Sequence, residues 1–125
     1  MKIIAVAALF MAMSGVVSDQ VRGRNAGIIP VNGGDPARGA RAIGTYGCGS
    51  CHVIPGIAGA SNYVGPPLNA YAKRAYVAGK LPNEADNLIY WIQQPQAVWP
   101  GNAMPNLGVT DQDAHDIAAY LYTLR

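Results

Sequence analysis

The stretch YGCGSCHVIPG, residues 46–56, contains the only two cysteines of this 125-residue chain. Cys48 and Cys51 stand three positions apart, and His52 follows the second cysteine directly. Two thiols and an imidazole in this order suit three kinds of chemistry: a structural zinc site, a thiol–disulfide redox centre, or covalent attachment of haem. Other features of the sequence are needed to distinguish these three possibilities.

The zinc and redox interpretations lack the partners that they need. A structural zinc site takes four ligands, and outside the motif the chain has one further histidine, His115. A redox Cys-x-x-Cys motif is expected beside a βαβ pattern, which this sequence does not show. For haem, thiols three residues apart reach the two vinyl groups of one porphyrin, and the next imidazole bonds its iron. The motif therefore predicts one covalent haem c per chain, with His52 on the iron.

The opposite face of that iron has two candidate ligands. Met104 is the only methionine after residue 13, and it lies in the Gly- and Pro-rich stretch WPGNAMPNLG, which can carry a side chain over the haem. A loop methionine more often serves only in packing. His115 sits one position off the apolar stripe of a predicted helix and near two aspartates, which is typical of a surface histidine. The placement favours Met104 as the iron ligand.

The N-terminal residues have the composition of an export signal. Lys2 precedes an uncharged apolar run over residues 3–17. This run suits a signal-peptide core and is short for a membrane span, which takes about 20 residues. We expect residues 1–18 to be a signal peptide or, alternatively, an uncleaved membrane anchor. Residues 19–34, without periodicity and containing Gly, Asn and Pro, are expected to be a flexible linker. Either way, the folded part faces the exported, periplasmic side.

Length and charge narrow the function further. A chain of this length is expected to hold one folded domain, which we place at residues 35–125. Nine Lys and Arg residues against seven Asp and Glu residues give no support to nucleic-acid binding. The basic residues are concentrated in the first part of the chain and the acidic ones in the last. We expect these charged side chains, Asp116 among them, to form ordinary solvated surface.

Capping residues and apolar periodicity predict an all-α domain without strands. Asp35 followed by Pro36 is a strong helix start, and that helix runs into the cysteine motif. A second helix is predicted from Pro67 or Leu68 to Ala78. Loops rich in glycine and proline are predicted over residues 53–66 and 94–108.

Two further helices follow in the second half of the chain. The third is predicted over residues 84–94, with Asn83 as its cap and Pro95 as its terminator. The last begins at Thr110, which forms a capping-box-like start with Asp113. Its apolar stripe consists of Ala114, Ile117, Ala118, Leu121 and Leu124.

Residues 35–125 resemble a class I c-type cytochrome and are similar to cytochrome c domains associated with terminal oxidases. The matching motifs are CGSCH at 48–52, GPPL at 65–68, the AMP around Met104, and a terminal helix ending IAAYLYTLR. Class II cytochromes c′ carry the haem motif near the C-terminus, unlike this chain. The resemblance implies a small cytochrome c fold in which the first and last helices cross and two long loops enclose the haem.

The resemblance also implies roles for individual residues. The carbonyl of Pro66 would accept a hydrogen bond from the His52 ring, and Leu68 would pack on the haem. The helix crossing would bring Gly39 and Ala40 opposite Tyr120 and Leu121. The cofactor-binding set is then Cys48, Cys51, His52, Pro66, Leu68 and Met104, with His52 and Met104 as the iron ligands. The roles of the aromatic residues stay open, namely Tyr63, Tyr71, Tyr90, Trp91 and Trp99.

An iron bound by both His52 and Met104 has no free position for a substrate, which favours a one-electron carrier over an enzyme. We expect a monomer that meets its partners, a reductase or dehydrogenase donor and an oxidase acceptor, through small, short-lived contacts. One alternative is a cytochrome c subunit of a terminal oxidase or dehydrogenase complex, tethered to the membrane by residues 3–18. A second alternative is a haem protein that binds gases or acts as an enzyme, should Met104 not bind the iron.

Overall fold

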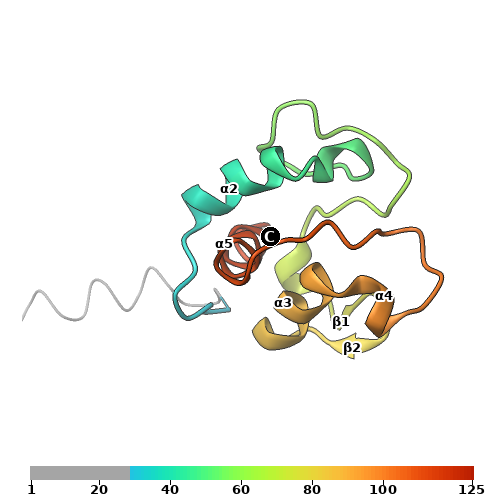
Figure 1. Cartoon of the computed structure of the whole chain (residues 1–125). Coiled ribbons are helices and arrows are strands. Elements are labelled where there is room, and N and C mark those ends of the chain that lie inside the picture. Colours follow the sequence, from blue (N-terminus) through green and yellow to red (C-terminus); the bar gives the residue numbers. More distant parts are fainter. Residues whose placement is uncertain (1–28) are drawn as a thin grey trace, which may run out of the picture.

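The computed structural model describes residues 29–125 (Figure 1). The expected signal or anchor, and the linker up to residue 28, lie outside the described residues. Within residues 29–125, none of the helices has the length and hydropathy that crossing a membrane requires. The elements in chain order are α2 (Pro36–Thr45), the 3₁₀ turns η1 (Cys48–Ser50) and η2 (Tyr71–Lys73), β1 (Tyr76–Val77), β2 (Leu81–Pro82), α3 (Ala85–Gln93), α4 (Pro95–Val98) and α5 (Asp111–Leu121).

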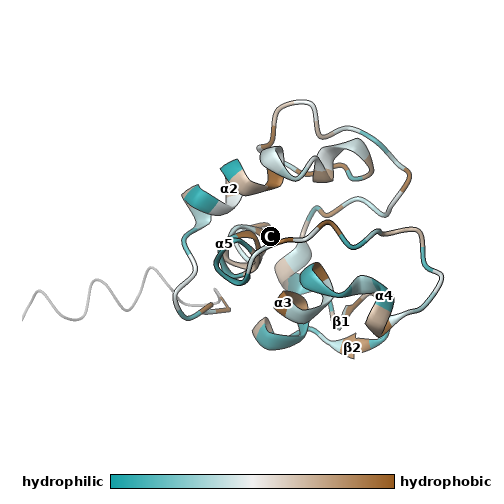
Figure 2. Ribbon diagram, viewed as in Figure 1, coloured by the Kyte–Doolittle hydropathy of each residue, from teal (hydrophilic) through white to brown (hydrophobic). Residues whose placement is uncertain are grey.

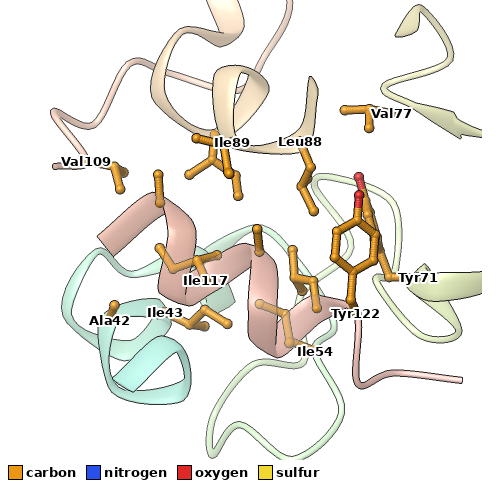
Figure 3. Packing of buried hydrophobic residues seen from close by; sticks show 14 of the residues in the cluster. Ala42, Ile43, Ile54, Tyr71, Val77, Leu88, Ile89, Val109, Ile117 and Tyr122 are labelled. Carbon is orange, nitrogen blue, oxygen red and sulfur yellow. The ribbon is translucent and has the colours of Figure 1, made fainter. Parts of the chain in front are cut away.

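The C-terminal helix α5 is the centre of the core, with α2 and α3 packed against it (Figures 1 and 3). Its predicted start is confirmed, because the Thr110 hydroxyl accepts a hydrogen bond from the Asp113 backbone N–H. The predicted stripe is buried from Ala114 to Leu121, and Leu124, beyond the helix end, is half-buried. Burial of this stripe removes apolar area from water and so stabilises the fold. Other members of the same core cluster are Ile43 from α2, Leu88 and Ile89 from α3, and Val77, Tyr71 and Tyr122.

The predicted first helix and its crossing with the last helix are both present. The Asp35 carboxylate caps α2 by accepting a hydrogen bond from the Arg38 backbone N–H. A Cβ atom on Gly39 would lie only 2.0 Å from the carbonyl oxygen of Asp116 and 3.0 Å from the Cβ of Tyr120. The crossing therefore needs glycine at position 39. In Figure 2, α2 changes from hydrophilic at its start to hydrophobic near its end, where Ile43 enters the core.

The prediction that Asp116 is surface-exposed was wrong, because its side chain is only 1% exposed. Its carboxylate accepts hydrogen bonds from Arg38 Nε and Nη2 at 2.8 and 2.9 Å, the Asp35 backbone N–H at 2.8 Å, and Gln112 Nε2 at 3.0 Å. These donors, led by Arg38, hold the pKa of Asp116 below its usual value. An aspartate buried by a partner in another helix has no signature in the local sequence.

The predicted second helix is absent, and residues 67–78 contain only η2 and β1. Ala70 and Ala78 adopt left-handed backbone angles, with φ of 51° and 52°, which an α-helix excludes. The Arg74 side chain donates a hydrogen bond to the carbonyl of Pro67. Strands β1 and β2, which were not predicted, pair antiparallel over two residues each, a length at which side-chain alternation cannot be detected.

The third helix forms, but with different ends. Glu84 stands at its N-cap position, and the Asn83 side chain donates instead to the carbonyls of Tyr71 and Arg74. Asn83 also accepts a hydrogen bond from the hydroxyl of Tyr122, so it joins three segments of the chain. Pro95 follows the end of α3 and also begins the one-turn helix α4, where proline suits the first position.

Residues 29–34 belong to the segment expected to be a linker, and they contact the domain. Ile29 and Val31 are partly buried against the core. The carbonyl of Gly33 accepts a hydrogen bond from Gln112 Nε2, and a Cβ on Gly34 would lie 2.6 Å from the carbonyl oxygen of His115. These residues therefore lie against α5 before α2 begins.

Candidate haem site

The cysteine motif follows α2 directly and is held by its own backbone. Gly47, with φ of 69°, turns the chain out of the helix into η1. The backbone N–H groups of Cys51 and His52 both donate to the carbonyl of Cys48, at 3.2 and 3.0 Å. Cys48 and Cys51 form no disulfide, and burial raises the pKa of the Cys48 thiol. Two unpaired thiols are thus presented from one short turn, with the imidazole next to them.

The His52 ring is oriented by a backbone carbonyl. Its Nδ1 lies 2.7 Å from the carbonyl oxygen of Pro66. Because a carbonyl can only accept, Nδ1 carries the proton and donates it, which leaves Nε2 with a lone pair for a metal ion. This is the hydrogen bond that the family resemblance implied. A hydrogen bond of this kind also raises the basicity of a metal-bound histidine.

Gly65 is a site residue that the sequence analysis quoted within a motif but did not assign. A Cβ atom at this position would lie 2.4 Å from His52 Cε1 and 2.8 Å from Nδ1. The Gly65 backbone N–H donates to the carbonyl of Cys51 at 2.7 Å, which brings the GPPL segment against the motif. Glycine lets the backbone approach the face of the imidazole. The sequence feature that could have revealed this role is the position of Gly65 directly before Pro66, whose carbonyl was expected to bind the His52 ring.

Leu68 lies in the same segment, three residues beyond Gly65. Its backbone N–H donates to the carbonyl of Val53 at 2.8 Å, so it is held next to the residue that follows His52. Its side chain is half-buried against the core cluster. The structure thus brings Leu68, Pro66 and His52 together, while contact between Leu68 and haem stays a prediction.

Met104 is held in a loop without regular secondary structure between α4 and α5. Its side chain is half-buried. The Met104 N–H donates to Asn102 Oδ1 at 2.7 Å, and its carbonyl accepts from Gln96 Nε2 at 2.8 Å. Both backbone polar groups of Met104 are therefore bound by side-chain amides. The sequence analysis assigned no role to Gln96 or Asn102.

Tyr46 connects the cysteine motif with the end of the Met104 loop. Its hydroxyl donates to Asp113 Oδ2 at 2.7 Å and accepts from the Thr110 backbone N–H at 3.3 Å. Tyr46 stands two residues before Cys48, and Thr110 is the last residue before α5. Figure 1 shows the end of α2 and the orange-red segment that leads into α5, which come from different parts of the chain. The tyrosine thus joins the start of the segment that carries His52 to the end of the loop that carries Met104.

His115 is partly buried, with 28% of its side chain exposed, and it lies beside Asp111. Its Nδ1–H donates to the carbonyl of Asp111 at 2.7 Å, and the same nitrogen lies 3.7 Å from the Asp111 carboxylate. Within the part of the chain that the structure describes, no group of three or more His, Cys, Asp or Glu side chains could hold a metal ion.

Four of the aromatic residues with open roles take different places. Tyr71 is buried, and burial raises its pKa to about 12. Trp91 is half-buried against the core. Trp99 is 45% exposed, with Lys80 Nζ 4.3 Å from the ring centroid, and Tyr63 is 75% exposed. These positions leave Tyr71 as a core residue and Trp99 as part of a cation–π pair.

The donor set fits a c-type haem. Two thiols that are not bonded to each other are available for covalent attachment, and an imidazole with its Nδ1 already bound offers Nε2. A thioether in a fixed loop is the remaining ligand type, and the histidine–methionine combination occurs in cytochromes c. A small, mostly helical domain that contains these two thiols, the imidazole and the thioether has the groups expected of a haem-binding electron-transfer protein.

Comparison with known proteins identifies the family. The family model for cytochrome c matches residues 36–125, and the chain belongs to the cytochrome c family. Its cofactor is therefore haem c with iron, and its function is haem-based electron transfer.

Two curated relatives are cytochrome c oxidase subunits 2. The one from Alkalihalophilus pseudofirmus is 32% identical over 89 residues, which cover 70% of this chain and 25% of that protein. The one from Bacillus sp. strain PS3 is 29% identical over 96 residues, covering 73% and 27%. The chain thus spans about a quarter of the length of these relatives. No solved structure gives a significant match.

Proposed function

We propose that this protein is a one-electron carrier in which His52 and Met104 are the axial ligands of a single haem, attached through Cys48 and Cys51. The observation that carries the proposal is the His52–Pro66 hydrogen bond, 2.7 Å long, with Gly65 against the ring. It fixes the imidazole with Nε2 available for iron. Leu68, held beside the motif, is proposed to pack on the haem.

Bound haem supplies the iron that gains and loses the electron. The chain contributes ligands that stay in place in both redox states. The Pro66 carbonyl keeps the proton at His52 Nδ1, so the ring presents the same nitrogen throughout. A methionine sulfur opposite the histidine raises the reduction potential relative to two nitrogen ligands. Small rearrangement and a raised potential both suit a carrier.

We place this carrier on the exported side of a membrane, as a periplasmic monomer. Residues 1–18 are proposed to be a signal peptide, and residues 19–34 a linker whose last part, 29–34, lies on the domain. The proposed partners are a reductase or dehydrogenase as donor and an oxidase as acceptor. Their contacts would be small and transient, as redox encounters are.

The similarity to oxidase subunits favours a second candidate function. In this alternative, the domain is a cytochrome c subunit of a terminal oxidase complex and remains tethered by residues 3–18. The mass and N-terminal sequence of the mature protein distinguish the two. A chain that begins near residue 19 and is released with the soluble fraction supports the carrier. An intact N-terminus that co-purifies with membranes supports the tethered subunit.

Absorption spectra of the purified holoprotein test the ligand assignment. We expect a haem that remains attached after denaturation, a sulfur-to-iron charge-transfer band when oxidised, and no CO binding when reduced. Met104→Ala should abolish the band and open the reduced iron to CO. His115→Ala is the matched control and should leave both properties unchanged. Rapid CO binding by the wild-type protein would contradict six-coordinate iron and favour the gas-binding alternative.

A further inference from the structure

The loop that carries Met104 is organised around one glutamine side chain. Gln96 Nε2 donates to the carbonyls of Asn102 and Met104, both at 2.8 Å. Its Oε1 accepts from the Gly101 backbone N–H at 3.0 Å. A single amide thus uses both of its donor hydrogens and its acceptor on three residues of one turn. No charged group takes part in these hydrogen bonds.

Asn102 completes the arrangement from within the loop. Its Oδ1 accepts from the Met104 N–H at 2.7 Å, while its Nδ2 donates to the carbonyls of Pro95 and Trp99 at 3.0 and 2.6 Å. Pro95 is fully buried at the start of α4. The Met104 backbone is therefore connected through side chains to a residue fixed in the core.

The main-chain N–H of Gln96 belongs to the same arrangement. It donates to Asn106 Oδ1 at 3.3 Å, so a free donor at the start of α4 is bound by a residue beyond Met104. The loop is thereby held on both sides of Met104, by Asn102 before it and Asn106 after it. The loop follows the short helix α4 (Figure 1), and Gln96 of this helix is hydrogen-bonded to loop residues through both its main chain and its side chain.

We infer that Gln96 is a positioning residue for Met104: its two donated hydrogen bonds hold the loop in the conformation from which the methionine sulfur binds iron. This inference rests on the proposed His52–Met104 ligation. A thioether is a neutral ligand, and a free loop loses conformational entropy each time it is fixed for binding. A loop already fixed by the protein avoids that loss at the moment of binding, in the way that preorganisation strengthens binding generally.

Three variants separate positioning through hydrogen bonds from simple filling of space. Gln96→Ala removes the whole amide. Gln96→Glu keeps the volume and the acceptor for Gly101, but replaces the two donors with a carboxylate oxygen facing two carbonyl oxygens. Gln94→Glu is the matched control, since the Gln94 side chain is exposed and makes no hydrogen bond within residues 29–125.

The measurement is displacement of methionine from the oxidised holoprotein by added imidazole, followed through the sulfur-to-iron charge-transfer band. Loss of one hydrogen bond of typical strength corresponds to about a fivefold change in an equilibrium constant, and Gln96 donates two to the loop. We expect both Gln96 variants to lower the imidazole concentration at half-displacement by about tenfold or more. Gln94→Glu should match the wild type. Far-ultraviolet circular dichroism checks that all three variants retain the helical fold.

The outcomes distinguish this inference from the proposed function. A wild-type protein without the band overturns the His52–Met104 ligation and the inference with it. A wild-type band together with folded Gln96 variants that resist imidazole as well as the wild type overturns only the inference. A Gln96→Glu variant that behaves as wild type, while Gln96→Ala is weakened, would show that volume rather than hydrogen bonding matters, and would also overturn it.

Hydrogen exchange of the wild-type holoprotein provides a test that needs no variant. The amides of Met104 and Gly101 are bound by Asn102 and Gln96, whereas the Leu107 amide donates no hydrogen bond within residues 29–125. We expect the first two to exchange at least tenfold more slowly than Leu107. Equal exchange at the three sites would mean that the side-chain amides do not hold the loop, and would overturn the inference.

Discussion

The α2–α5 crossing and the Met104 loop are stabilised by different kinds of interaction. At the crossing, Gly39 lets two helix backbones touch, and Asp116 is almost completely buried among four hydrogen bonds. In the loop, Met104 is half-buried, and its backbone is bound by the amides of Gln96 and Asn102. The first region depends on close helix packing together with a buried, hydrogen-bonded carboxylate, and the second on hydrogen bonds from two side-chain amides.

This contrast shows how one small domain combines a packed helical framework with a loop that a few side-chain hydrogen bonds hold in place. Disturbing the crossing affects every element that packs on α5, because α5 contacts both α2 and α3. Disturbing the loop changes the position of one side chain and leaves the core intact. We therefore expect substitutions in the framework to lower global stability, and substitutions in the loop to change iron ligation.

The largest effect is expected at the crossing itself. Gly39→Ala places a Cβ 2.0 Å from the Asp116 carbonyl oxygen and forces the helices apart, which should lower the free energy of unfolding by about 3 kcal/mol or more. Gly44→Ala, in the same helix with nothing within 4 Å, is the control and should raise it by about 0.5 kcal/mol. Chemical denaturation followed by circular dichroism measures both. Equal stability of the two variants would show that the crossing is not closely packed.

A smaller effect is expected where the framework meets His52, the proposed iron ligand. Gly65→Ala would push against the His52 ring and weaken its hydrogen bond to Pro66, lowering the free energy of unfolding by about 2 kcal/mol. The displaced ring should also shift the reduction potential, which Gly44→Ala should leave unchanged. Protein-film voltammetry measures the potential. A Gly65→Ala potential identical to that of the wild type would contradict the close approach to the ring.

Acid should weaken the crossing through Asp116. Hydrogen bonds from Arg38 are the largest cause that lowers the pKa of Asp116. A carboxyl whose pKa is lower folded than unfolded stabilises the protein above its ordinary pKa of about 4, and this contribution is lost as the pH falls below that value.

Asp116→Asn should remove that acid dependence. It should cost about 1 to 2 kcal/mol at neutral pH, because asparagine keeps one acceptor but loses the charge. Urea denaturation between pH values of about 3 and 7 measures the difference between variant and wild type, which should shrink towards the acid end. A difference that does not depend on pH would show that the negative charge of Asp116 does not contribute to the stabilisation.

The smallest effect on stability is expected at the connection between the two regions. Tyr46→Phe removes the hydroxyl that donates to Asp113 and accepts from the Thr110 N–H. It should lower the free energy of unfolding by about 1 kcal/mol. Tyr90→Phe is the control, because the ring of Tyr90 is 49% exposed and its hydroxyl has no hydrogen bond within residues 29–125. A Tyr46→Phe stability equal to that of Tyr90→Phe would show that the hydrogen bonds of the Tyr46 hydroxyl do not stabilise the fold.

Local signals predicted the helices whose caps and stripes lie within a few residues of each other. Asp35 and Thr110 cap α2 and α5 as expected, because a side-chain cap acts on an N–H three residues away. The helix predicted over residues 67–78 does not form, because contacts with residues outside this segment override its local preference for helix. The Asn83 side chain donates hydrogen bonds to the carbonyls of Tyr71 and Arg74 in this segment, and Ala70 has left-handed backbone angles.

The candidate site likewise contains features that the local sequence predicts and features that it does not. The spacing of Cys48, Cys51 and His52 could be interpreted directly because attachment chemistry depends on neighbouring residues. The importance of Gly65 beside the ring and of Gln96 beneath Met104 could not, because each acts on a residue eight or more positions away. Such contacts exist only once the chain has folded.

The sequence by itself determined the haem motif, the all-α class and the family, since these depend on residue types at short spacing. Only the tertiary structure decided that Asp116 is buried, that Gly39 meets the backbone carbonyl of Asp116, and that the Met104 loop is bound by side-chain amides. The physical reason is that burial and long-range hydrogen bonding depend on which segments meet in space. Those meetings are set by the packing of α2 and α3 on α5, which no short stretch of the chain encodes alone.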